Sequence, residues 1–109
     1  MKIGVSANGG SLDAEVEPRF GRCPYFMVVD SDDMRFDIFH NSGSTAAGGA
    51  GVKAAQTFQQ RGVNVVLTGQ VGPNAQQGLE AAGIKIVTGT SGNVRKAVED
   101  YLAQAEKSE

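Results

Sequence analysis

The stretch VNVVLTGQVGPNAQQGLEAAGIKIVT, residues 63–88, decides the fold class of this chain. Its first six residues, Val63 to Thr68, are rich in β-branched side chains and predict a buried strand. Pro73 suits the first position of a helix and Gly83 suits its end. Ile84 to Thr88 predict the next strand. A strand, a helix and a second strand in this order predict a right-handed crossover between parallel strands.

Helical periodicity flanks this unit on both sides. From Gly48 onward, Val52, Ala55 and Phe58 follow helical spacing, and Gly62 lies where a left-handed cap ends a helix. After the second strand, apolar residues recur at spacings of three and four, which predicts an amphipathic third helix. These residues are Val94, Ala97, Val98, Tyr101, Leu102 and Ala105.

The amino-terminal part of the chain has strand patterns. Ile3, Val5 and Ala7 alternate with small residues, and the block from Tyr25 to Asp30 is apolar up to its last residue. Within residues 34–40, Met34, Phe36, Ile38 and His40 alternate with Arg35, Asp37 and Phe39. The acidic turn at 30–33 joins the last two strands as a hairpin. The complete pattern predicts one α/β domain over residues 1–109, with a mixed five-stranded sheet flanked by three helices, compatible with the ribonuclease-H-like arrangement.

Composition excludes several classes of protein. Ten basic and twelve acidic side chains among 109 residues give a net charge of −2, which provides no broad cationic field for a nucleic acid. No run approaches the roughly 18 apolar residues that span a bilayer, and no signal-peptide core follows Met1. We therefore expect a cytoplasmic protein without nucleic-acid or membrane partners. A single Cys23 cannot form an internal disulfide.

Three glycine-bearing segments fall where ligands bind in open α/β sheets, beyond the carboxyl ends of strands and before helices. They are residues 48–51, 69–73 and 89–92. Bare backbone at a helix amino terminus lets an anion approach its N–H groups. The pattern predicts an anion-binding rim that includes Gly48, Gly49, Gly51, Gly69 and Gly72. The alternative is that these glycines only form turns and caps.

The segment at 13–26 contains the chain's only thiol beside two arginines. Neighbouring cations lower the pKa of a thiol, so Arg19 and Arg22 make Cys23 a candidate metal ligand. The alternative for Cys23 is a small buried side chain at the start of a strand. The two arginines are candidate contacts of a bound anion, or they form solvated ion pairs with nearby glutamates.

His40 is the second candidate metal ligand. It ends a predicted strand, and a neutral imidazole binds iron, copper or zinc. The alternative is a surface or capping residue.

The sequence gives little support for catalysis. Lys53 is followed by Ala54, so the glycines before it do not form a P-loop, and Gly69 and Gly72 have the wrong spacing for a dinucleotide fingerprint. Asp37 is the only acidic residue inside a predicted strand, whereas a two-metal nuclease needs several. We expect a protein that is not an enzyme.

Several motifs carry a resemblance to a known family. They are EPRFGRCPYF at 17–26, GGAGV at 48–52, VLTGQVGPNA at 66–75 and AGI at 82–84. In this order the motifs resemble the dinitrogenase iron-molybdenum cofactor biosynthesis family, small domains related to NifX, NafY and the carboxyl-terminal part of NifB. Some relatives have histidine directly before the Phe-Gly pair, where this chain has Arg19.

The resemblance implies a ribonuclease-H-like fold without nuclease activity that carries an iron-molybdenum or other iron- or molybdenum-sulfur cluster, or its precursor. The expected partners are the proteins that donate and accept the cluster, and we expect a monomer. Cys23 is the first candidate to touch metal and His40 the second, with Arg19 and Arg22 around the cluster. One alternative is a metal-free regulatory domain that senses a small anionic metabolite, and another is a hydrolase or nuclease.

Overall fold

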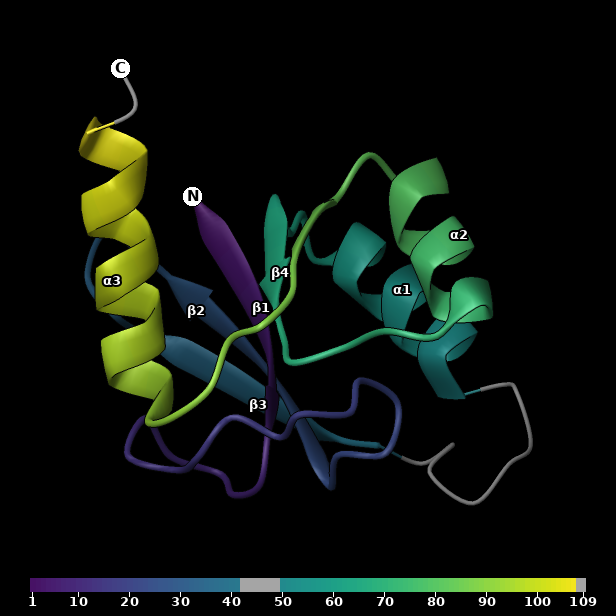
Figure 1. Cartoon of the computed structure of the whole chain (residues 1–109), viewed down its shortest axis with the longest axis horizontal. Coiled ribbons are helices and arrows are strands. Elements are labelled where there is room, and N and C mark those ends of the chain that lie inside the picture. Colours follow the sequence, from purple (N-terminus) through teal and green to yellow (C-terminus); the bar gives the residue numbers. More distant parts are fainter. Residues whose placement is uncertain (42–49, 108–109) are drawn as a thin grey trace.

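A five-stranded sheet in the order β3-β2-β1-β4-β5 runs through the middle of the molecule (Figure 1). The structure is a computed structural model, and it describes residues 1–41 and 50–107. The prediction of a mixed five-stranded sheet with three helices is confirmed. In chain order the elements are β1 (Lys2–Ala7), β2 (Tyr25–Asp30), β3 (Phe36–His40), α1 (Ala50–Gln60), β4 (Val65–Leu67), α2 (Pro73–Ala81), β5 (Lys85–Val87) and α3 (Val94–Lys107).

Strand direction changes at the centre of the sheet. β1 pairs antiparallel with β2, and β2 pairs antiparallel with β3. On its other side β1 pairs parallel with β4, which pairs parallel with β5. The carboxyl ends of β1, β4 and β5 therefore meet at one end of the sheet, and the β2–β3 hairpin turn lies at the other.

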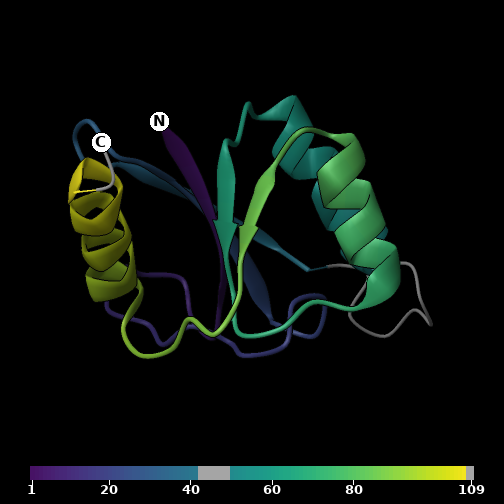
Figure 2. The same cartoon turned by 45° about the horizontal axis from the view of Figure 1, so that its top comes forward.

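The helices cover the two faces of the sheet unequally. Figure 2 shows α3 alone on one face and α1 with α2 on the other. Strand side chains alternate between these layers, so Ile3 and Val5 pack in the α3 layer while Phe26 and Val28 pack against the α1 layer. In the described part of the chain, no helix is long and apolar enough to cross a membrane.

Several predicted boundaries shift in the structure. β3 begins at Phe36 because Met34 has φ +60°, a left-handed conformation that interrupts a strand. The left-handed position predicted after α1 is confirmed at Gly62 (φ +73°), and Gly83, predicted to end the next helix, follows α2 with φ +76°. α1 begins at Ala50, so Gly51 lies inside the helix and not in a loop before it.

Candidate functional site

Buried polar contacts tie together the loops at the carboxyl ends of the parallel strands. The hydroxyl groups of Ser6 and Thr68 lie 2.8 Å apart in the core. The N–H of Glu17 donates to the Ser6 carbonyl at 2.8 Å, and the N–H of Thr90 donates to the Thr68 carbonyl at 3.0 Å. The loop after β1 and the loops before α2 and α3 therefore form one connected surface. Gly48 and Gly49, in the first segment of the predicted anion-binding rim, lie outside the described residues, so their place in the rim stays a prediction.

The amino terminus of α3 is closed by the protein itself. The N–H groups of Val94 and Arg95 donate to the carbonyl oxygens of Ala14 and Leu12, each at 2.9 Å. The side-chain oxygen of Asn93 accepts the N–H three residues further on at 3.1 Å. Segment 11–16 thus lies across the start of this helix. The prediction that the glycine-bearing loop before α3 offers its helix terminus to an anion is wrong, because protein acceptors already occupy these N–H groups.

The amino terminus of α2 is open by comparison. Gly72 is its N-cap with φ −75° and makes no side-chain capping hydrogen bond. Gly72, Pro73 and Asn74 are exposed, and a Cβ atom built on Gly72 would meet nothing within 4 Å. Pro73 follows as the first helical residue and has no N–H of its own. The first turn at the positive end of the α2 dipole is therefore exposed.

The loop that carries the two arginines is fastened beside this terminus. The N–H of Gln70 donates to the Pro18 carbonyl at 2.7 Å, and the N–H of Phe20 donates to the Gln70 carbonyl at 3.0 Å. A Cβ atom on Gly69 would lie 2.5 Å from the Pro18 oxygen, which is far too close. Gly69 therefore serves this close approach of two backbone segments, a role that does not require a ligand.

Arg19 and Arg22 are exposed, and within residues 1–41 and 50–107 neither guanidinium forms an ion pair. The nearest acidic contact of this loop is a long one, from the backbone N–H of Arg19 to the Glu17 carboxylate at 3.4 Å. The alternative of solvated ion pairs with glutamates is thus not found in this part of the chain. The loop beside the open end of α2 therefore carries two exposed cationic side chains.

Cys23 lies in a different environment from the one predicted. Its side chain is 0% exposed and packs in the aromatic cluster with Phe20, Phe26 and Phe58. Burial raises the pKa of the thiol to about 11, because a low-dielectric surrounding disfavours the thiolate. The prediction that the neighbouring arginines lower this pKa is wrong. Metal ligation by Cys23 stays a prediction, and the burial of the thiol argues against it.

His40 ends the edge strand β3 and is exposed. Its ring lies 4.8 Å from the ring of Tyr25, its cross-strand partner. Its role as a metal ligand remains a prediction. Among the described residues, no group of three or more histidine, cysteine, aspartate or glutamate side chains could hold a metal ion.

No pattern in the sequence predicts that segment 11–16 covers the start of α3. One signal was present, since Asn93 directly precedes the helical stripe and asparagine is a favoured N-cap. The charged residues around Val28, at the hairpin end of the sheet, could not be predicted as a group because they come from β1, the β2–β3 hairpin and the residue after α1.

Comparisons with known proteins identify relatives of the whole chain. A family model described as dinitrogenase iron-molybdenum cofactor matches residues 1–104. The apo form of the orange protein from Desulfovibrio gigas is 45% identical, with a TM-score of 0.89 over 94% of this chain and 88% of that one. A NifB-like protein from Thermotoga, assigned to the DUF35 family, is 28% identical, with a TM-score of 0.81 over 94% and 87%. An uncharacterized protein of Methanocaldococcus jannaschii is 26% identical over 105 residues, 94% of this chain and 86% of its own length.

Proposed function

Because the chain belongs to the dinitrogenase iron-molybdenum cofactor family, we propose that it binds a molybdenum- or iron-containing sulfide cluster, or its precursor, and passes it between proteins without catalysing a reaction. Family membership confirms the resemblance drawn from the residues. The family description supports the type of cargo, and the similarity to an orange protein described in its apo form supports a protein that also exists with a bound group.

The observation that carries this proposal is the open amino terminus of α2 beside the arginine loop. Metal-sulfide clusters are anionic, so peripheral sulfides or oxygens accept hydrogen bonds from backbone N–H groups and guanidiniums. One helix terminus contributes about 0.3–1 kcal/mol at an exposed site. Arg19 and Arg22 add two cationic donors on the loop fastened to Gln70. Gly72 is exposed and has no described atom within 4 Å of where a Cβ would lie, so its backbone is accessible to a ligand.

Among the described residues, the groups available to a cluster are cationic side chains and backbone N–H groups, and no set of three or more metal-ligating side chains is present. A cluster held mainly by its periphery is released easily, because each 1.4 kcal/mol withheld weakens binding about tenfold. Weak, exposed attachment suits a protein that must hand its cargo to an acceptor. His40 is the accessible candidate for a single direct contact with metal, and Cys23 would first have to leave the core.

We also propose a fold arrangement, an oligomeric state and a cellular location for this protein. The strand order β3-β2-β1-β4-β5 with helices on both faces supports the ribonuclease-H-like arrangement. We take the chain to act as one domain and as a monomer in the cytoplasm, meeting a donor and an acceptor of the cluster in turn.

Anaerobic reconstitution tests the proposal. The protein is incubated with molybdate, iron(II) and sulfide, passed through a desalting column, and assayed for metal content and visible absorbance. We expect the parent to retain metal and an Arg19→Gln/Arg22→Gln variant to bind at least about fivefold more weakly, since two charged contacts are removed. A Lys85→Gln/Lys96→Gln variant has the same net charge and should bind like the parent.

Two results would overturn parts of this account. Equal retention by the arginine and lysine variants would show that the arginine loop is not the binding surface. If the parent retains no metal but is stabilised against heat by molybdate alone, with no chromophore, the metal-free sensing of a small anion is the better description.

A further inference from the structure

Five charged side chains line a pocket at the hairpin end of the sheet. Lys2 and Asp30 are cross-strand partners on β1 and β2. The N–H of Asp30 donates to the Arg35 carbonyl at 2.8 Å, which places Arg35 opposite Asp30 on the hairpin. Asp37 in β3 is the cross-strand partner of Val28, so the two side chains project from the same face of the sheet. The guanidinium of Arg61, just after α1, lies 3.5 Å from the Asp37 carboxylate.

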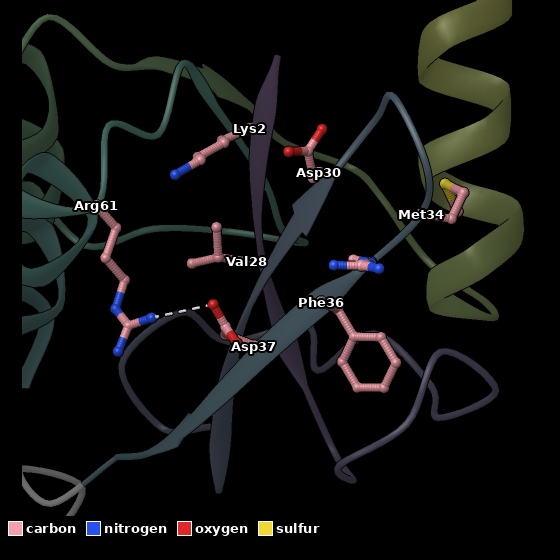
Figure 3. Close-up of a pocket in the computed structure, with 8 residues that line it drawn as sticks. Lys2, Val28, Asp30, Met34, Phe36, Asp37 and Arg61 are labelled. Atoms are coloured by element: carbon pink, nitrogen blue, oxygen red, sulfur yellow. Dashed lines mark ion pairs between the residues drawn. The ribbon is translucent and has the colours of Figure 1, made fainter.

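Two of the three cations here have an ion-pair partner. Arg35 is paired with Asp33 at 3.4 Å and its side chain is largely exposed, and Arg61 is paired with Asp37. Within the described residues Lys2 forms no ion pair. Figure 3 shows Lys2 and Arg61 on the same side of the pocket, with Val28 beside them and Asp37 joined to Arg61. An anion placed in the gap between Lys2 and Arg61 would contact two cationic side chains.

The gap has an apolar floor and a fixed cation. Val28 is 6% exposed and lies at the base of a pocket of about 710 Å³ that the five charged residues also line. Such a volume is within the range of small-molecule sites, about 300–1,000 Å³. The Arg61 guanidinium carbon lies 5.2 Å from the centre of the Phe39 ring, so a cation–π contact and the ion pair with Asp37 both restrain it.

We propose that this pocket binds the oxyanion, carboxylate or phosphate, of a small metabolite between Lys2 and Arg61. The short apolar body of the metabolite then rests on Val28. Lys2, Arg35 and Arg61 are balanced by Asp30, Asp37 and the Asp33 carboxylate that pairs with Arg35, and this absence of net charge favours a single anionic group over a polyanion.

This site is separate from the open end of α2. β1 runs from Lys2 at the pocket to Ala7 at the carboxyl-end loops, five residue steps that span roughly 16 Å at the usual rise of a strand. The inference therefore does not depend on cluster binding, and occupancy of one site leaves the other open.

A titration followed by two-dimensional NMR of the uniformly ¹⁵N- and ¹³C-labelled protein tests the proposal. Inorganic phosphate and propionate are the probes, and sodium chloride at matched ionic strength is the reference. We expect saturable shifts of the Val28 methyl groups and of the Lys2 and Arg61 signals. The probe that saturates at lower concentration identifies phosphate or carboxylate as the preferred oxyanion.

Single-residue variants distinguish binding in this pocket from nonspecific electrostatic attraction to the protein surface. Lys2→Gln and Arg61→Gln should each weaken binding about threefold, as expected for one exposed charge contact. Asp37→Asn should strengthen binding, because it frees Arg61 from its carboxylate. Lys85→Gln removes a cation at the other edge of the sheet and should change nothing. Equal weakening by Lys85→Gln, or shifts that chloride reproduces, would overturn the proposal.

Discussion

The amino termini of α2 and α3 occupy equivalent places after neighbouring parallel strands, and both follow a glycine-bearing loop, yet only one is open. Segment 11–16 covers the start of α3 and accepts the N–H groups of Val94 and Arg95. At α2 the corresponding residues Gly72, Pro73 and Asn74 are exposed, and a Cβ atom on Gly72 would meet nothing within 4 Å. The difference teaches that a glycine loop before a helix predicts a ligand site only where no other segment of the chain already satisfies the helix.

The largest effect should come from breaking the junction that places the arginine loop beside α2. Gly69→Ala would put a Cβ atom 2.5 Å from the Pro18 oxygen, so the two backbone segments must separate. We expect a loss of about 2–3 kcal/mol in the free energy of unfolding, measured by urea denaturation. Gly72→Ala is the matched control and should cost less than about 1 kcal/mol. Similar costs for both variants would contradict the tight junction.

The buried thiol of Cys23 gives a pH-dependent effect. The pKa of Cys23 is raised from 9.0 to about 11 in the folded protein. The unfolded chain therefore loses its thiol proton first, and stability falls as the pH rises from about 9 to 11, by about 2 kcal/mol from this group. The measurement is the difference between parent and Cys23→Ala in urea denaturation at pH 8 and pH 10.5, which removes the contributions of tyrosine and lysine. Parallel pH profiles would show that the thiol is not sealed in the core.

The closed terminus can be opened by removing its cap. Asn93→Ala deletes the side chain that accepts an N–H of α3 and donates to the Asp13 carbonyl at 3.1 Å. We expect a loss of about 1 kcal/mol in the free energy of unfolding. Asn74→Ala, in the exposed first turn of α2, should stay within about 0.5 kcal/mol of the parent. If the two variants are equally stable, the comparison between the two termini loses its basis.

Local patterns were sufficient for most of the fold. The β-branched run at 63–68, Pro73 and Gly83 identified the βαβ unit because each acts through local backbone preferences. The predicted strand began at Met34, two residues before β3, because a methionine in the left-handed conformation has no sequence signal as clear as that of glycine. Strand order depended on contacts between distant segments and could not be read from periodicity.

The candidate site was less predictable because its properties depend on what covers each group. Arg19 and Arg22 are near Cys23 in sequence, but their side chains are exposed while the thiol points into the aromatic cluster. Sequence proximity therefore suggested a lowered pKa where burial gives a raised one. The closure of α3 depends on residues about 80 positions earlier, such as Asp13 beside Asn93, which no short motif reveals.

The central claim is that α2, and not α3, presents its amino terminus to an anionic cargo. Its most direct test uses a substitution with the smallest expected change in stability. Gly72→Asp adds a carboxylate cap to α2 and should raise stability by about 0.5 kcal/mol. Ser91→Asp adds the same charge to the loop before α3. After anaerobic reconstitution with molybdate, iron(II) and sulfide, we expect Gly72→Asp to lose most of its metal and Ser91→Asp to retain as much as the parent. Equal metal content in the two variants would contradict the account.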